Sequence, residues 1–362
     1  MNYRLATIFA ETTYSDDATE IIDVNVKDPV SQLIIRFQAR NGIGANSTAH
    51  PMKCLSKIEL VDGSDILFSL SGPEAHALDW YSHMVERPNI MWYLPSQVQE
   101  MALHISFGRF LYDPILALDP AKFTNLQLKI TLNVGGGGMN NDQIVMSIVA
   151  HLFDEKTVTP AGFLMSKEIK DYALGAGTHE YTDLPVDYPY RKLLLRTQKD
   201  GVGTEYCFDT LKLSEDNDKR IPFNNKILEI LHAITAQGRP YREWIGVGGG
   251  SADRYFHCTP AYWPGFSISH WEGSAIAQDA TIWGGDGQYA RLLTTGVGGN
   301  YQALCEGWCP QGVVEIPFGL QNDPADWYQT ANIGTLRLDL KSGGGMSPTE
   351  TCQVFIQQHR PY

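Results

Sequence analysis

The order of short strand and helix segments in this chain occurs twice, and this repeat constrains the fold more than any other feature. Matching segments stand in the same order in both halves. One order in two copies predicts two tandem domains of one fold. In the first half the segments are LIIRFQ (33–38), SKIELVDG (56–63), a helical stretch (73–84), HISFGRFLYDP (104–114), NLQLKITLNVGGGG (125–138) and IVMSIVAHLFD (144–154). In the second half they are LLLRTQ (193–198), TLKLSEDN (210–217), a helical stretch (225–237), EIPFGLQNDP (315–324), GTLRLDLKSGGG (334–345) and CQVFIQQHRP (352–361).

The spacing between matching residues supports the repeat and locates an insertion. Leu33 and Leu193 are 160 residues apart, whereas the three later pairs are 208 to 211 residues apart. The second copy therefore carries about 55 additional residues after its helical stretch. We expect a first domain over 1–157 and a second over 158–362, with the inserted region at about 238–314.

Hydrophobic alternation indicates that both domains are built from β-strands. Lys57–Val61, Leu126–Leu132 and Leu336–Leu340 alternate apolar and polar residues, as strands with one buried face do. The two helical stretches are short, and the stretch 85–103 has no counterpart in the second half. The pattern predicts an all-β chain with one short helix in each half.

The inserted region differs in composition from the rest of the chain. Five of the eight tryptophans lie in it, together with many glycines. Glycine-rich turns with aromatic anchors predict a long, self-packed loop assembly that projects from a rigid scaffold. We expect such loops to make contacts with partners.

Charge and cysteine usage bear on compartment and partners. The formal net charge is −13, and no run of five or more Lys or Arg residues occurs, so direct nucleic-acid binding is not expected. The N-terminus lacks the pattern of a secretory signal, and no stretch reaches 18 apolar residues. We expect folding in the cytosol and six free thiols. The cysteines are Cys54, Cys207, Cys258, Cys305, Cys309 and Cys352.

Three segments invite a ligand-binding interpretation that their spacing does not support. Gly246–Ser251 has neither the Lys of a phosphate loop nor the spacing of a dinucleotide loop, which favours a plain turn. His76 and His83, near Glu74 and Asp79, share one helix face without an evident third ligand, which favours a surface stripe at a subunit contact. A zinc site would need a second closely spaced ligand pair. The residues considered for zinc are His257, Cys258, His270, Cys305 and Cys309.

Acidic residues are abundant, and either a glycosidase pair or a calcium loop could use them. No spacing singles out such a site, and most of these residues are typical of turns. The chain also lacks a G-x-S-x-G motif. We therefore predict no catalytic residue, no cofactor, no metal and no enzyme activity. The acidic residues considered are Asp62, Asp65, Asp113, Asp119, Asp209, Asp216, Asp218, Asp253, Asp286 and Asp323.

Tandem β domains with a short helix after the third strand of each, and a large insertion in one copy, resemble one known family. It is the double jelly-roll major capsid proteins of the adenovirus and tailless membrane-containing phage lineage. The similarity covers nearly the whole chain, and residues 104–130 carry the strongest local similarity. The resemblance implies two tandem eight-stranded jelly-roll β-sandwiches, with the inserted region forming an outer tower.

The resemblance also implies a structural protein of the virion, made in the host cytoplasm. Its homotrimers would have a pseudo-hexameric outline and tile an icosahedral shell. Expected partners are further copies of the chain, neighbouring capsomers, minor capsid or penton proteins and, in some members, an internal membrane near Tyr3–Phe9. Two alternatives stay open: a trimeric carbohydrate-binding or tail-spike β-sandwich protein, and a β-sandwich glycosidase.

Overall fold

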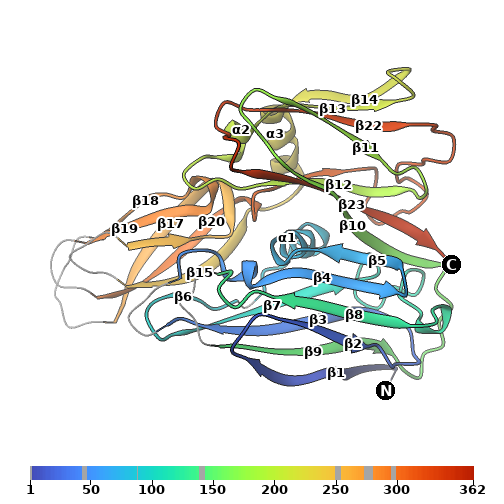
Figure 1. Ribbon diagram of the computed structural model, residues 1–362, viewed down its shortest axis with the longest axis horizontal. Coiled ribbons are helices and arrows are strands. Elements are labelled where there is room, and N and C mark those ends of the chain that lie inside the picture. Colours follow the sequence, from blue (N-terminus) through green and yellow to red (C-terminus); the bar gives the residue numbers. More distant parts are fainter. Residues whose placement is uncertain are drawn as a thin grey trace.

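The protein is mostly β-strand, as Figure 1 shows. The computed structural model describes residues 2–42, 47–87, 89–137, 143–248, 254–272, 280–294 and 299–362. None of the helices in these ranges is both long and apolar enough to span a membrane.

The first half forms a β-sandwich of two four-stranded sheets. Their strand orders are β1-β9-β3-β7 and β2-β8-β4-β5. Each sheet mixes strands that are distant in sequence, which is the arrangement of a jelly roll. The strands are β1 (Tyr3–Tyr14), β2 (Ala18–Asp23), β3 (Val30–Arg40), β4 (Leu55–Asp62), β5 (Asp65–Leu70), β7 (Val98–Ser106), β8 (Leu126–Leu132) and β9 (Ile144–Phe153).

The second half repeats this topology, which confirms the double jelly roll. Its sheets are β10-β23-β12-β21 and β11-β22-β13-β14, so the strands pair in the same order as their counterparts in the first half. The strands are β10 (Gly162–Ala173), β11 (His179–Leu184), β12 (Tyr190–Thr197), β13 (Phe208–Glu215), β14 (Arg220–Lys226), β21 (Val313–Pro317), β22 (Leu336–Ser342) and β23 (Thr351–Pro361).

Residues matched by sequence spacing occupy matching strands, with one shift of register. Leu33 and Leu193 lie in β3 and β12, and Leu126 and Leu336 begin β8 and β22. In β9 and β23, the last strand of each half, Val149 pairs with Ile34 and Phe355 pairs with Leu194. Val149 therefore corresponds to Phe355, and the sequence alignment of His151 with His359 is two residues out of register. A shift of two keeps each side chain on its face of the sheet, so the alternation pattern could not reveal it.

Both helices lie close to the predicted ranges 73–84 and 225–237, but each follows more strands of its half than expected. α1 (Gly72–His83) follows the fifth strand of its half, and so does α3 (Ile227–Gln237). The third-strand prediction was wrong because β1 and β2 do not alternate strictly and because β5 returns after a tight turn. A further helix, α2 (Thr204–Cys207), was not predicted. The described residues also form three short 3₁₀ turns, η1 (Pro51–Cys54), η2 (Pro120–Lys122) and η3 (Asp286–Gln288).

The inserted region folds into strands, so the predicted loop assembly was wrong. Its sheets have the orders β17-β20-β15-β6 and β16-β19-β18. The edge strand β6 (Met91–Tyr93) comes from the first half and pairs with the insertion, so this part of 85–103 has no counterpart, whereas residues from Val98 onward belong to β7. The inserted strands are β15 (Tyr241–Gly248), β16 (Arg254–His257), β17 (Pro260–Glu272), β18 (Ala280–Gly284), β19 (Tyr289–Thr294) and β20 (Asn300–Pro310).

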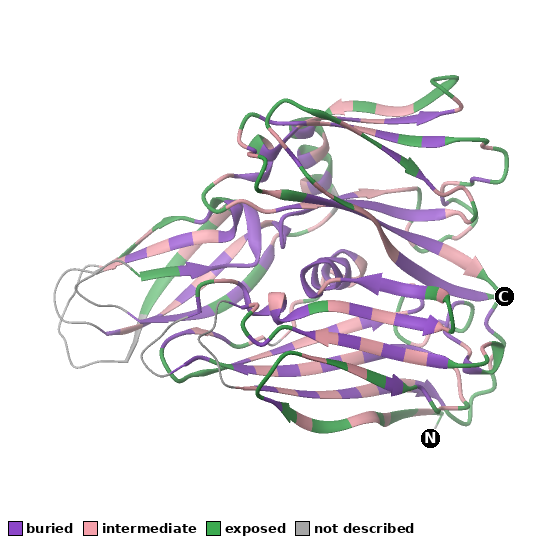
Figure 2. Ribbon diagram, in the orientation of Figure 1, coloured by how far each residue is buried: buried purple, intermediate pink, exposed green. Residues whose placement is uncertain are grey.

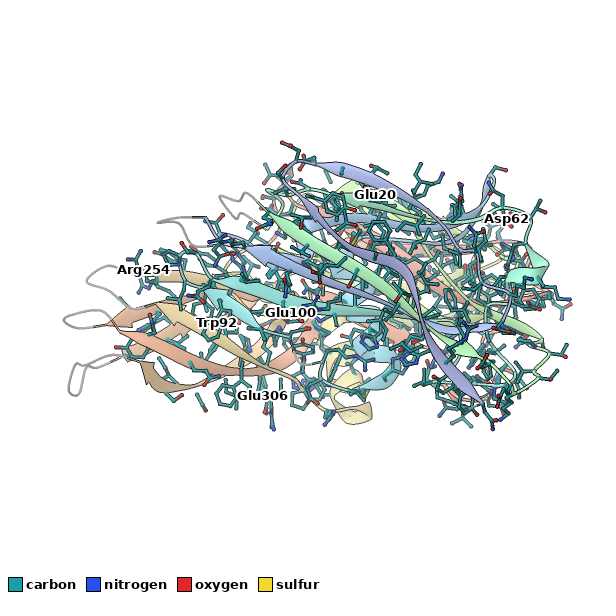
Figure 3. All side chains as sticks on the ribbon, turned by 90° about the horizontal axis from the view of Figure 1, so that it is seen from below. Glu20, Asp62, Trp92, Glu100, Arg254 and Glu306 are labelled. Atoms are coloured by element: carbon teal, nitrogen blue, oxygen red, sulfur yellow. The ribbon has the colours of Figure 1, made fainter. Side chains whose placement is uncertain are left out.

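One glycine in this region serves close packing instead of a turn. Trp92 of β6 lies beside the inserted strands (Figure 3), across from Gly246 of β15. A Cβ atom at Gly246 would stand 1.9 Å from the Trp92 ring, so only glycine leaves room for it. Glycine and tryptophan in this region predicted loops from the sequence, but at this pair they allow two strands of a sheet to pack closely.

The two jelly rolls are joined through a shared sheet. β5 pairs with β10 in parallel at Phe68↔Ser166 and Ser69↔Lys167. This contact produces an eight-stranded sheet of order β2-β8-β4-β5-β10-β23-β12-β21, and one hydrophobic core extends through both halves (Figure 2). The boundary expected near 158 lies between β9 and β10, and the division into two separate domains stays a prediction.

Candidate functional site

Helix α1 lies between the two jelly rolls (Figure 1), and it carries three buried polar side chains, Glu74, His76 and Asp79. Every residue from Gly72 to Tyr81 is buried, including Glu74, His76 and Asp79. The predicted surface stripe at His76 and His83 was therefore wrong. The helix is polar because both halves supply partners for its side chains, and the sequence of the helix alone does not show this.

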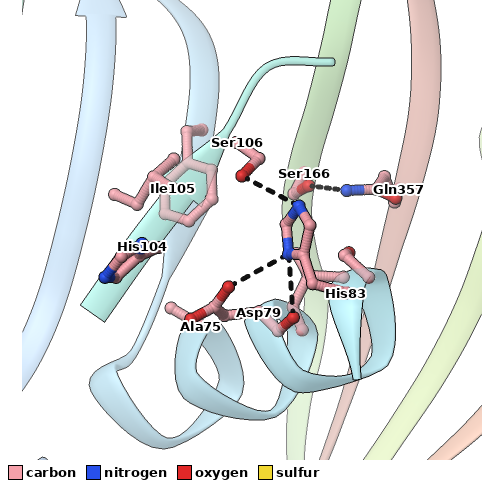
Figure 4. Close-up of a pocket in the computed structure, with 11 residues that line it drawn as sticks. Ala75, Asp79, His83, His104, Ile105, Ser106, Ser166 and Gln357 are labelled. Carbon is pink, nitrogen blue, oxygen red and sulfur yellow. Dashed lines mark hydrogen bonds and ion pairs between the residues drawn. The ribbon is translucent and has the colours of Figure 1, made fainter. Parts of the chain in front are cut away.

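One end of α1 forms a serine–histidine–aspartate arrangement (Figure 4). The Oγ of Ser106 lies 3.4 Å from Nε2 of His83, and Nδ1 of His83 lies 3.1 Å from Oδ1 of Asp79. Burial alone would raise the pKa of Asp79, but hydrogen bonds from His83 and Arg87 lower it to about 2. The order of groups is the one that activates a serine nucleophile.

The surroundings of this arrangement oppose catalysis. Arg87 donates two hydrogen bonds to Asp79, at 3.0 and 2.7 Å, so the carboxylate is already neutralised by a fixed cation. Ser106 also accepts a hydrogen bond from Gln32 at 2.8 Å. The adjoining cavity of about 10 Å³ has room for about one water molecule. The geometry supports a structural polar junction, since an acyl substrate has no space beside the serine.

A second polar network joins α1 to the inserted strands. Gln311 Nε2 lies 3.0 Å from Nδ1 of His76, and Nε2 of His50 lies 3.0 Å from Oγ1 of Thr259. Thr259 donates both its backbone N–H and its hydroxyl to Glu243, each at 2.6 Å. These side chains come from the first half and from the insertion, so the network fixes the junction between these two regions.

Burial sets the protonation of this network. It lowers the pKa of His76 to about 4 and lowers that of His50 well below the usual value. Burial also raises the pKa of Glu243 to about 7, while the hydrogen bonds from Thr259 oppose the rise. Neutral imidazoles and a carboxyl group that ionises only near neutrality are the forms that a dry interior favours.

The other sequence candidates do not converge on a site within the described residues. No group of three or more His, Cys, Asp or Glu side chains there could hold a metal ion. Cys258, Cys305 and Cys309 are buried, and burial raises the pKa of the Cys309 thiol to about 12. The side chain of His270 lies outside the description. Gly246–Gly248 ends β15, and the rest of that glycine-rich segment is also outside it.

Several acidic residues hold turns, as their composition suggested. Asp216 accepts hydrogen bonds from the backbone N–H groups of Gly334 and Thr335, both at 2.9 Å. Asp62 likewise accepts from the N–H groups of Thr124 and Asn125. These contacts use the carboxylates to satisfy backbone donors.

A buried ion pair on the second-half sheet was not predicted from the sequence. Lys192 of β12 forms a salt bridge with Glu315 of β21, and both side chains are almost entirely buried. Burial lowers the pKa of Lys192 to about 8, although Glu315 opposes the change. The signal was present in the adjacent Arg191 and Lys192, which directly precede the apolar run Leu193–Leu195.

Comparison with solved structures shows the same fold over nearly the whole chain. The major capsid protein of Sulfolobus turreted icosahedral virus aligns with a TM-score of 0.60 at 10% identity, over 98% of this chain and 96% of its own. VP54 of the virus PBCV-1 aligns at 0.58 and 11% identity, over 99% and 94%. The major capsid protein P2 of bacteriophage PM2 aligns at 0.57 and 9% identity, over 99% and 98%. No protein-family model and no curated protein sequence matches this chain.

Proposed function

We propose that the chain is the major capsid protein of an icosahedral virus and has no enzyme activity. The observation that carries the proposal is the alignment of two fused jelly rolls with capsid proteins over at least 94% of both chains in each pair. In each pair the alignment extends through both jelly rolls and the insertion, which supports a shared structural role. The crowded serine–histidine–aspartate arrangement supports a structural role for the polar junction.

The assembly that fits this function is a homotrimer with a pseudo-hexameric outline. Two similar sandwiches in one chain give six similar bodies in three chains, and six bodies tile a flat facet. The trimers would then contact neighbouring capsomers, minor capsid or penton proteins and, in a virion with an internal membrane, lipid. The chain would be made in the host cytoplasm, be located in the virion, and not bind nucleic acid directly.

The native mass of the purified protein tests this proposal. Light scattering after size exclusion is expected to give three times the 40.3 kDa chain mass, or a larger assembly built from that unit. A monomer at micromolar concentration would contradict the proposal. Glycan arrays and glycosidase assays would then decide between the two remaining interpretations.

A further inference from the structure

Helices α1 and α3 occupy equivalent places in the two jelly rolls. α1 packs against strands β4 and β7 and against the turn η1. α3 packs against the matching elements of the second half, strands β13 and β21 and helix α2. Each also begins in the same way, because Glu74 accepts a hydrogen bond from the N–H of Ser71, and Glu229 accepts one from the N–H of Lys226. Residues of α3 therefore correspond to residues of α1 155 positions earlier.

The outer side of α1 is covered by the second-half sheet β10-β23-β12-β21. The hydroxyl of Tyr81 donates to the carbonyl oxygen of Val313 at 2.7 Å, and Lys192 donates to the carbonyl oxygen of Tyr81 at 3.1 Å. Glu74 and Arg196 of β12 interact electrostatically. This helix-on-sheet contact holds the two jelly rolls together inside one chain.

The same side of α3 has no cover within the described part of the chain. Its exposed residues lie on one face of the helix, and Leu228 keeps 48% of its surface exposed. Their counterparts in α1 are all buried. The exposed residues are Leu228, Glu229, His232, Ala233 and Ala236, and their counterparts are Pro73, Glu74, Ala77, Leu78 and Tyr81.

The first half contains the matching open sheet face. Ile34 of β3 pairs with Val149 of β9, in the places that Leu194 and Phe355 hold in the second half. Leu194 and Phe355 are fully buried, whereas Ile34 and Val149 are partly exposed on the outer face of their sheet. Two apolar side chains thus occupy positions that a helix covers in the other jelly roll.

Charge is complementary at the same positions. Arg36 of β3 corresponds to Arg196, which interacts with Glu74 of α1. The counterpart of Glu74 in α3 is Glu229, an exposed carboxylate. Arg36 is 38% exposed, and its ion pairs with Glu11 and Glu100 lie at the surface (Figure 3 labels Glu100). Glu229 on a second copy would therefore find a guanidinium in the position that Arg196 holds for Glu74.

We propose that α3 of one copy packs on the outer face of sheet β1-β9-β3-β7 of the next copy and repeats the contact of α1 inside the chain. This inference rests on the proposed function, and it names the surfaces through which the trimer forms. The contact is heterologous, because the helix and the sheet face are different surfaces. Three copies close into a ring if the contact between copies turns one jelly roll relative to the next by the same angle as the contact inside one chain.

A charge on α3 tests the contact. Leu228→Asp places a carboxylate in the apolar part of the contact, so the protein concentration at half dissociation is expected to rise more than about tenfold. Leu320→Asp is the matched control, since Leu320 is 68% exposed on a loop outside the contact. Light scattering over a dilution series gives the oligomeric state, and circular dichroism verifies that both variants fold.

Cross-linking tests the contact without disturbing it. Ile34→Cys and Leu228→Cys are prepared as separate variants, mixed, and treated with a short bismaleimide. The six native cysteines are buried and react slowly. A cross-linked dimer from the mixture, and none when Leu320→Cys replaces Leu228→Cys, is expected because only two different chains can supply this pair.

The outcomes separate the interface from the function. A trimeric wild type with a dissociated Leu228→Asp variant and a specific cross-link supports the contact. A trimeric wild type that keeps its mass in Leu228→Asp and gives no cross-link overturns the contact and leaves the proposed function standing. A monomeric wild type overturns both. If Leu228→Asp does not fold, the cross-link alone decides.

Discussion

The sheets β1-β9-β3-β7 and β10-β23-β12-β21 have the same topology but different surroundings. In β12 all residues but Arg196 are buried, whereas β3 buries one face and leaves alternate residues of the other partly exposed. The difference comes from α1, which covers the outer face of the second sheet but packs against the first sheet at its edge strand β7. The sequence of a strand therefore depends on what covers the strand as well as on its place in the topology. Leu193–Leu195 is a continuous apolar run, and its counterpart Leu33–Ile35 is followed by alternating polar and apolar residues.

The largest expected difference between the two sheets concerns ion pairs. Lys192→Met leaves Glu315 as an uncompensated buried charge, so it is expected to lower the free energy of unfolding by about 3–5 kcal/mol. Arg36→Met removes the surface ion pairs with Glu11 and Glu100 on the first sheet and is expected to cost about 0–1 kcal/mol. Urea unfolding of both variants measures the contrast, and equal losses would show that the sheets are not differently enclosed.

Apolar side chains at matching positions are expected to differ as well. Leu194→Ala creates a cavity under α1 and is expected to cost about 2–5 kcal/mol. Ile34→Ala lies at a partly exposed position and is expected to cost about 1 kcal/mol in the dissociated chain. Measuring both at low and high protein concentration sharpens the comparison, since assembly through this face raises the cost of Ile34→Ala only. A cost for Ile34→Ala that does not depend on concentration would count against the proposed contact.

The helices are expected to differ in their response to acid. The pKa of His76 is about 4 in the folded protein, below its ordinary value of 6.5. A lowered histidine pKa contributes stability that is complete above pH 6.5 and is lost as pH falls towards 4, by about 3 kcal/mol for a fully buried group. His76→Leu, which installs the residue found at the equivalent position of α3, is expected to make this acid-side decline shallower by that amount.

His232→Leu on the exposed face of α3 is the control for the acid response, and it is expected to change stability by at most about 0.5 kcal/mol. Chemical unfolding at pH 7, 5.5 and 4 gives the profiles. On the alkaline side Glu243 acts in the opposite sense. Burial raises the pKa of Glu243 from 4.5 to about 7 in the folded protein. Its contribution to folding stability is therefore complete below pH 4.5 and is lost as pH rises through 7. An unchanged acid slope in His76→Leu would mean that other buried groups dominate.

Particular residues show how much of this the sequence could predict. Ile58 and Leu211 match because the fourth strand of each half alternates in the same way, and period-two alternation is a local property. The burial of His76 was not predictable, because its cover comes from Tyr241 and Gln311, more than 160 residues away. The insertion was misjudged because glycine and tryptophan are as compatible with close sheet packing as with turns. The crowding around Ser106 also depends on distant strands.

The position of β23 has a consequence for synthesis. This strand is made after all the other described strands, yet it lies between β10 and β12 inside the eight-stranded sheet. Until it is inserted, β10 and β12 each present an unpaired backbone edge, and unpaired edges promote wrong associations. Completion of the second jelly roll must therefore wait until residues 351–361 have left the ribosome. Prematurely terminated chains lack this central strand, so only chains that extend through it can acquire the finished fold.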